Sequence, residues 1–161
     1  MSTLTFPQVT IPDYDHEIHT VVVDTVDQAS KNTFSVYLQH PLENVVQARL
    51  TAAHVHTLNS NVCNISVDEL NTNFIQQATS QLESPQLNYS FGTILPDSSG
   101  NFVFADNYPV VQQYITPIRK LGRMTFTLRN RNGDTITNPN DPADNYFIFR
   151  FVCKKSNMPE R

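Results

Sequence analysis

The C-terminal segment "NYFIFRFVCKK" places an apolar side chain at every second position, namely Phe147, Phe149, Phe151 and Cys153. In an extended strand, residues two apart point to the same face, whereas a helix would spread them around its axis. Three phenylalanines on one face need an opposing apolar layer to pack against. This spacing therefore predicts a strand in the core between packed β-sheets.

Most of the remaining chain has the pattern of further strands. Residues 18–25 are rich in β-branched side chains, and residues 33–39 alternate between apolar and polar positions. Further strands are expected at residues 45–58, 87–95, 101–104, 110–116 and 121–130. With eight or nine strands and no alternation of strands with helices, the sequence predicts an all-β sandwich, and a single jelly roll is the commonest eight-stranded form.

At most one short helix is expected. It would begin in "SVDELNTNFIQQATSQLES", where Ser66 is followed three residues later by Glu69 in the pattern of a capping box. Threonine and asparagine weaken the helical propensity of this segment.

A corner is predicted in "HPLEN", because Pro41 fixes its own backbone and holds His40 extended. The corner would separate the strand at 33–39 from the long strand at 45–58. A strand of that length is expected to bend or bulge near Ala52, and a bulge reverses the facing of every side chain beyond it.

Two other segments carry turn residues. "PDSSGN" predicts a hairpin that joins residues 87–95 to residues 101–104, and the dipeptide Asn132-Gly133 predicts a tight turn. Pro117 is expected to end the strand at 110–116.

The same alternation predicts the core. Phe34 begins an apolar face on one predicted strand, Phe126 lies on the face that Met124 begins on another, and Phe147 begins a face near the C-terminus. The predicted core residues are Phe34, Val36, Leu38, Leu50, Phe126, Leu128, Phe147, Phe149 and Phe151.

Length and composition agree with one β-rich domain. The chain has 161 residues, of which 39% are apolar, including ten Phe and six Tyr, and only 16% are charged. We expect residues 1–15 to form an extended N-terminal arm and residues 156–161 a short tail. Because there is no apolar run of about 18 residues and no signal-like start, neither a membrane span nor export by the usual route is expected.

Charge is distributed unevenly along the chain. Residues 1–118 carry two basic and eleven acidic residues, whereas residues 119–161 carry nine basic and four acidic residues. Such asymmetry favours an electrostatically oriented surface. An equally ordinary explanation is that the strands within residues 119–161 simply face solvent. The candidate interface residues are Arg119, Lys120, Arg123, Arg129 and Arg131.

His54 and His56 have the H-x-H spacing of some metal sites, and His16 and His19 would be further ligands. Cupins, which are metal-binding jelly rolls, use such a motif with a glycine before the first histidine and a glutamate soon after the second. Here the next carboxylate is Asp68, so the acidic ligand is missing. Hydrogen-bonded structural histidines are the favoured interpretation, with His54 and His56 kept as weak metal candidates.

Other chemical motifs are absent from the sequence. It contains no G-x-S-x-G, no glycine-rich phosphate loop and no H-E-x-x-H, so we expect no enzyme and no cofactor. No nucleic-acid signature accompanies the basic C-terminal strands, and specific nucleic-acid binding is not expected. Cys63 and Cys153 do not form a C-x-x-C motif, and whether they pair stays open.

Two segments resemble structural proteins of nucleocytoplasmic large DNA viruses. Residues 33–66, "TFSVYLQHPLENVVQARLTAAHVHTLNSNVCNIS", contain a corner similar to their L-x-x-P-L-x-N-V pattern. Residues 118–155 are similar to their closing hairpin, in which an L-x-x-L-T-x-x-L-x-D-x-x-G strand and turn precede an aromatic strand. Arg131-Asn132 replaces the usual aspartate before the turn glycine, and it suits the turn equally well.

The resemblance implies a capsid component and carries no catalytic residue with it. The expected function is that of a minor capsid protein that cements capsomers of the major capsid protein. The alternatives are a penton subunit at the fivefold vertex and, in a different class, a cupin-like metal-binding or carbohydrate-binding module. The implied partners are the major capsid protein, other minor capsid proteins and further copies of this chain, near an internal membrane. The implied location is the virion, after synthesis in the host cytoplasm.

Overall fold

The computed structural model describes residues 15–56, 61–78, 80, 88–136 and 144–155. These residues form nine strands and no helix. The described part of the chain therefore contains no helix that could span a membrane. The strands are β1 (His16–Asp24), β2 (Thr33–Val55), β3 (Cys63–Val67), β4 (Thr72–Gln76), β5 (Asn88–Ser90), β6 (Gly92–Ile94), β7 (Phe102–Ala105), β8 (Val111–Arg129) and β9 (Tyr146–Lys154). The fold is all-β, as the sequence predicts.

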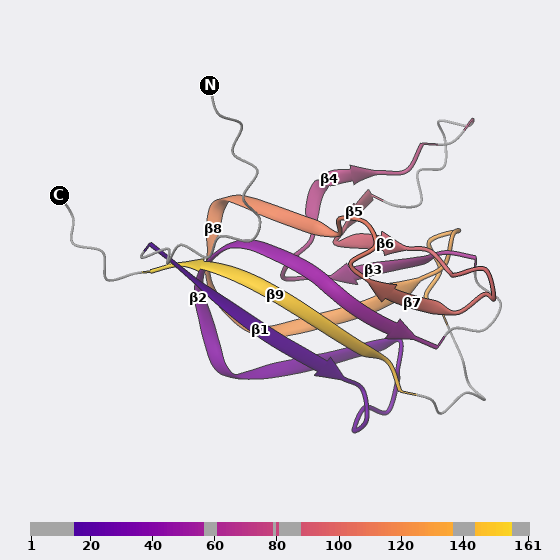
Figure 1. Ribbon diagram of the computed structural model, residues 1–161, viewed down its shortest axis with the longest axis horizontal. Helices are drawn as coiled ribbons and strands as arrows, with labels where there is room; N and C mark the ends of the chain where they lie inside the picture. Colours follow the sequence, from indigo (N-terminus) through magenta and orange to yellow (C-terminus); the bar gives the residue numbers. More distant parts are fainter. Residues whose placement is uncertain (1–14, 57–60, 79, 81–87, 137–143, 156–161) are drawn as a thin grey trace.

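Seven strands form one antiparallel sheet in the order β1-β9-β2-β8-β3-β6, with β7 paired to β2, and β4 pairs with β5 separately. The first part of β2 pairs with β8, from Thr33 opposite Thr127 onward. Its last part pairs with β9, ending with His54 opposite Tyr146. Because β2 changes its main partner along its length, the sheet curls so that β1 and β9 lie in front of part of β8 (Figure 1). This curled sheet is consistent with the expected sandwich, and the single jelly roll stays a prediction.

The predicted corner lies inside a continuous strand. The β2–β8 register shifts between Tyr37 and Leu42 and again between Val45 and Gln47, and Asn44 has a positive φ of 53°. Asparagine tolerates this left-handed conformation better than most residues do. The expectation of two separate strands at 33–39 and 45–58 is therefore wrong, because β2 continues through the corner and resumes its pairing with β8 at Leu42 after a register shift.

Pro117 lies inside β8 and does not end it. Ile118 pairs with Val45 and Gln113 pairs with Gln47, so β8 has an irregularity between these two pairs. Proline has no backbone N–H to donate, and at this irregularity the sheet needs no hydrogen bond from position 117.

The expected bulge near Ala52 is present. The β2–β9 register shifts between Leu50 and Ala52, and the buried positions move from Ala48 and Leu50 to Ala53 and Val55. His54 therefore points to solvent instead of sharing the face of Leu50.

The expected helix is wrong where the structure describes it. Residues 63–67 and 72–76 are strands, joined by a turn in which Val67 N donates to Asn71 Oδ1 at 2.9 Å. Glu69 does not cap a helix, because its carboxylate accepts hydrogen bonds from Thr125 N at 2.6 Å and Thr125 Oγ1 at 2.9 Å. The end of the expected helix, at residues 79 and 81–84, lies outside the described residues.

The predicted hairpin around "PDSSGN" is also wrong. β6 pairs with β3 and β7 pairs with β2, so the segment connects two distant parts of the sheet. The turn itself forms, because Asp97 Oδ1 accepts hydrogen bonds from Ser99 N and Asn101 N, both at 2.9 Å. At the other predicted turn, Gly133 has a φ of 86° and its N–H donates to the Asn130 carbonyl at 3.1 Å.

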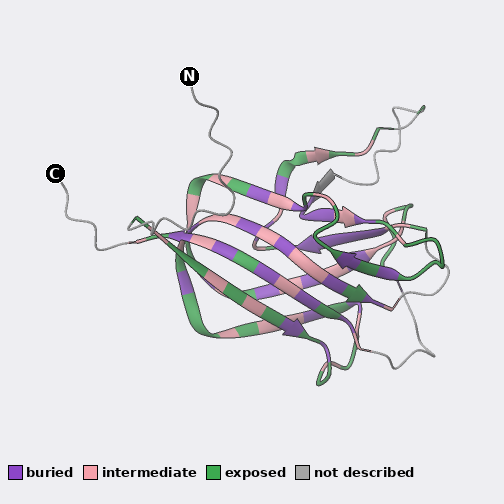
Figure 2. Ribbon diagram, viewed as in Figure 1, coloured by how far each residue is buried: buried purple, intermediate pink, exposed green. Residues whose placement is uncertain are grey.

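Figure 2 shows buried positions alternating with exposed ones along the strands. The buried core is rich in aromatic rings. Phe34 stacks on Phe126 with ring centroids 4.8 Å apart, and Phe149 lies 5.5 Å from Phe91 and 5.8 Å from Phe126. Of the predicted core residues, two are half-buried against the core, Val36 and Leu38, and the others are buried, namely Phe34, Leu50, Phe126, Leu128, Phe147, Phe149 and Phe151. The expected N-terminal arm and tail lie outside the described residues, except for Asp15.

Candidate interaction surface

The two histidines of the H-x-H motif have different surroundings. Their rings lie 4.3 Å apart, but His54 is exposed whereas His56 is half-buried. His56 Nδ1 lies 2.8 Å from the Asp144 carbonyl oxygen, and His56 N donates to Asn145 Oδ1 at 2.8 Å. These bonds join the end of β2 to the start of β9. Within the described residues, no group of three or more potential metal ligands lies together.

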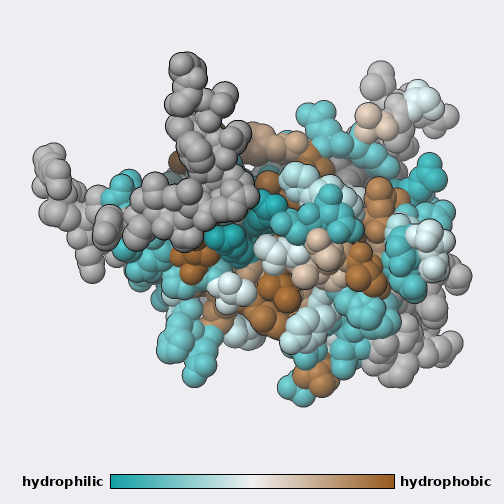
Figure 3. All heavy atoms as spheres, in the orientation of Figure 1, coloured by the Kyte–Doolittle hydropathy of each residue, from teal (hydrophilic) through white to brown (hydrophobic). Residues whose placement is uncertain are grey.

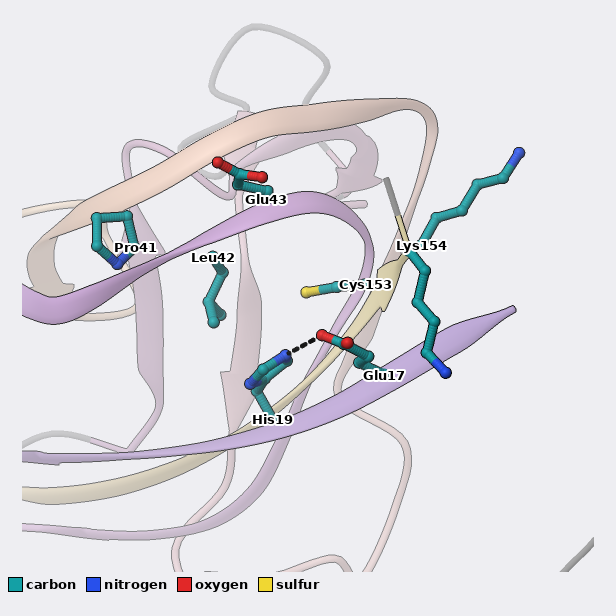
Figure 4. Close-up of a pocket in the computed structure, with 8 residues that line it drawn as sticks. Glu17, His19, Pro41, Leu42, Glu43, Cys153 and Lys154 are labelled. Carbon is teal, nitrogen blue, oxygen red and sulfur yellow. Dashed lines mark hydrogen bonds and ion pairs between the residues drawn. The ribbon is translucent and has the colours of Figure 1, made fainter. Parts of the chain in front are cut away.

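A small pocket of about 260 Å³ lies where β1 and β9 approach the corner of β2 (Figure 4). His19 Nε2 and Glu17 Oε2 lie 3.2 Å apart at its side, and Cys153 lines it. Burial raises the pKa of the Cys153 thiol to about 11, and the Glu17 carboxylate contributes to this rise. Cys153 is therefore a neutral thiol near pH 7, which is a poor nucleophile.

Cys63 is fully buried, and burial raises the pKa of its thiol to about 12. Neither cysteine takes part in a disulfide, which answers the question that the sequence left open.

The basic interface candidates separate into two groups. Arg119, Lys120 and Arg131 are exposed. By contrast, Arg123 Nε lies 3.2 Å from Glu69 Oε2, and hydrogen bonds to Glu69 and Tyr37 raise the pKa of its guanidinium. Arg129 Nη1 donates to the Gly133 carbonyl at 3.1 Å. Two of the five candidates are thus engaged within the domain.

The uneven charge of the sequence does not divide the folded molecule into two halves. β9, from the basic part of the chain, lies between β1 and β2, and β8 lies between β2 and β3. Arg150 is consequently opposite Thr20 on one side and Arg49 on the other, where Arg49 forms an ion pair of 2.7 Å with Asp106. Basic and acidic parts of the chain are thus interleaved in the sheet, and the electrostatically oriented surface stays a prediction.

One surface of the sheet combines apolar and polar side chains. The solvent-facing side of β1, β9, the end of β2 and β7 carries large hydrophobic side chains beside Thr20, His54 and Arg150, and we call it the outer face. Paired residues place Ile18 beside Val152, and Val22 beside Ile148. Its exposed members are Ile18 at 55%, Val22 at 52%, Val103 at 48% and Tyr146 at 44% relative exposure, with Ile148 and Val152 half-buried beside them. Figure 3 shows hydrophobic residues among hydrophilic ones on the side where β1 and β9 lie in front.

Next to the outer face, an open groove of about 580 Å³ runs between β1 and the first part of β2. Val21, Val36 and Leu38 line it and are half-buried against the core. In the part of the chain that the structure describes, β1 pairs only with β9, and β2 has no partner on its groove side between Thr33 and Leu42. The groove is therefore bordered by two sheet edges whose backbone groups can accept another strand.

The sequence interpretation missed the outer face, although one signal for it was present. Residues 21–23 are three consecutive valines, so β1 does not alternate between apolar and polar positions as a strand with one solvated face usually does. This lack of alternation indicates a strand whose two faces both avoid water.

Comparison with known proteins identifies no relative: no protein-family model matches the chain, and no curated protein matches its sequence. The fold and the surface define an all-β protein with an apolar sheet face and open sheet edges. Such a surface can bind another protein by apolar burial and by strand pairing.

Proposed function

We propose that the protein is a structural component of the icosahedral capsid of a large double-stranded DNA virus, a minor capsid protein that binds capsomers of the major capsid protein. The observation that carries the proposal is the outer face, where Ile18, Val22, Val103 and Tyr146 are all about half exposed or more. The resemblance of residues 33–66 and 118–155 to viral structural proteins supports the same class. The location that follows is the virion.

The outer face supports a binding role because solvated sheet faces normally carry polar side chains. Each Å² of apolar surface removed from water stabilises a contact by about 25 cal/mol, before the costs of association are subtracted. Contiguous apolar patches on soluble proteins commonly mark sites of protein–protein contact. In a shell, such a face would be covered by a neighbouring subunit.

The exposed basic residues would act differently. Arg119 and Lys120 lie on β8 near its bend, where Lys120 pairs with Glu43 of β2. Charges at the rim of an interface chiefly set the encounter rate and the orientation of the partners, whereas buried apolar groups hold the complex together. We therefore assign these two residues to the rim of the proposed contact.

The proposal is tested by analysing purified particles of the virus that encodes the chain. Quantitative mass spectrometry should detect the protein at a fixed ratio to the major capsid protein, and reconstruction of the particle should locate its density in the shell. Density confined to the fivefold axes would identify a penton subunit instead of a minor capsid protein. Presence in infected cells together with absence from purified particles would contradict the proposal.

A further inference from the structure

The geometry points to a second interaction site, which is independent of the proposed function: the free edge of β1 pairs with the same edge of a second copy of this chain. The two β1 strands would lie antiparallel around a twofold axis that passes beside Thr20. The argument depends on the exposed backbone of the edge, on the lack of protection along it and on the self-complementary order of its side chains.

The backbone hydrogen bonds show which residues face the edge. At one end of the β1–β9 ladder Lys155 N donates to the Asp15 carbonyl at 3.0 Å, and at the other end Thr25 N donates to the Asn145 carbonyl at 3.2 Å. The register between these ends has no shift. In an antiparallel ladder the bonded pairs alternate with pairs whose N–H and C=O groups point away. Ile18, Thr20, Val22 and Asp24 therefore present their backbone groups to the free edge.

The other edges of the main sheet are short or interrupted, whereas the edge of β1 is long and regular. β6, at the opposite end of the strand order, has three residues and β7 has four, and short edge strands are poor templates for pairing. β2 carries Pro41 where its groove side lacks a partner. β1 has nine residues with neither proline nor lysine among them, and its charged residues, Glu17 and Asp24, lie near its two ends. Long edges without these residues readily accept another strand.

The side chains of β1 are complementary to themselves when Thr20 lies opposite Thr20 of the second copy. Ile18 then faces Val22 on both sides of the axis. All of these are even-numbered residues, so this register also pairs the exposed backbone groups. Cross-strand apolar pairs and threonine pairs each stabilise a sheet.

The pairing would also extend the apolar surface. Ile18 and Val22 belong to the outer face, so the outer faces of the two copies would join across the twofold axis into one continuous surface. A contact of this kind is isologous, because each copy contributes the same strand. The interaction partner that the edge fits best is therefore a second copy of this chain.

Sedimentation velocity of the full-length chain over a range of concentrations tests the inference. We expect a reversible dimer that Thr20→Lys and Thr20→Glu each weaken about fivefold or more, because like charges would lie directly opposite each other. An equimolar mixture of the two variants should restore dimerisation, since lysine then faces glutamate. Thr116→Lys, at an exposed threonine of β8, is the matched control and should dimerise as the unmodified chain does.

A second pair of variants tests the register if either Thr20 variant fails to fold. Ile18→Lys and Val22→Glu lie opposite each other in the proposed dimer, so each alone should weaken it and their mixture should restore it. A chain that is monomeric at all concentrations would overturn the inference. So would a dimer that all four variants leave unchanged, because its interface would then lie elsewhere or involve residues 1–14.

Discussion

At the scale of single residues, Phe149 shows how the sequence forms this core. Its ring lies between 5.5 and 5.9 Å from those of Phe91, Phe126 and Phe151, which come from three different segments of the chain. One aromatic side chain on β9 therefore links its own strand to β8 and to the segment between β5 and β6. The burial of Phe149 follows from the period of two in β9, whereas the identity of its partners does not.

The buried thiols predict a loss of stability at alkaline pH. A cysteine is neutral when protonated, and burial raises the folded-state pKa of Cys63 from 9.0 to about 12. Above pH 9 the unfolded chain releases the proton first, so the free energy of unfolding should fall by up to about 1.4 kcal/mol per pH unit for this group. The stabilisation is complete below pH 9 and is lost progressively toward pH 12.

Denaturant unfolding between pH 8 and pH 11 measures this effect, with Cys63→Ala as the comparison. The variant should be less stable at pH 8, because it leaves a small cavity, but its stability should decline less steeply with pH. Identical slopes for the two proteins would show that Cys63 does not titrate differently in the folded and unfolded states.

At the scale of the elements, Asn145 joins the ends of three strands. Its side-chain amide donates to the Lys31 carbonyl at 2.7 Å, and its Oδ1 accepts from His56 N at 2.8 Å. Its backbone N donates to Thr25 Oγ1 at 2.8 Å. Asn145 is fully buried at the start of β9, and these bonds connect it to the end of β1, the beginning of β2 and the end of β2.

Replacing this side chain should destabilise the whole sheet. Asn145→Ala leaves a part-buried carbonyl at Lys31 and a part-buried backbone N–H at His56 without their partners, and we expect a cost of about 3 kcal/mol in the free energy of unfolding. Asn107→Ala, at an exposed position, should cost less than about 0.5 kcal/mol. Chemical denaturation of both variants provides the measurement, and similar values for the two would contradict the assigned role of Asn145.

Local patterns predicted the elements better than they predicted the pairing. The strand at Tyr146–Lys154 and the turn at Gly133 follow from residues adjacent in sequence. The role of Glu69 does not, because its partner Thr125 lies 56 positions away. The facing of His54 likewise depends on a register shift against β9. Contacts that form only after the sheet has curled leave no periodic signal in the chain.

At the scale of the whole molecule, the order of the strands decides which surface features persist. β8 and β9, from the basic part of the chain, are interleaved with strands from its acidic part, so neighbours in the sheet are not neighbours in the sequence. The same order gathers apolar side chains from β1, β7 and β9 into the outer face, although they are far apart along the chain. The candidate site could therefore be predicted only in part, since basic residues are visible in a sequence and a shared face is not.

The central claim is that the outer face attaches the protein to a capsid, and incorporation into particles measures it most directly. Val103→Lys combined with Tyr146→Lys changes two exposed residues of that face away from the β1 edge, and Leu95→Lys is the matched control at a 55% exposed residue on neither the outer face nor that edge. Each tagged variant would be expressed during infection, and its ratio to the major capsid protein determined in purified particles. We predict that the ratio falls about tenfold or more for the double variant, because buried lysines disrupt an apolar contact, and is unchanged for the control. Incorporation of the folded double variant at the unmodified ratio would contradict the account.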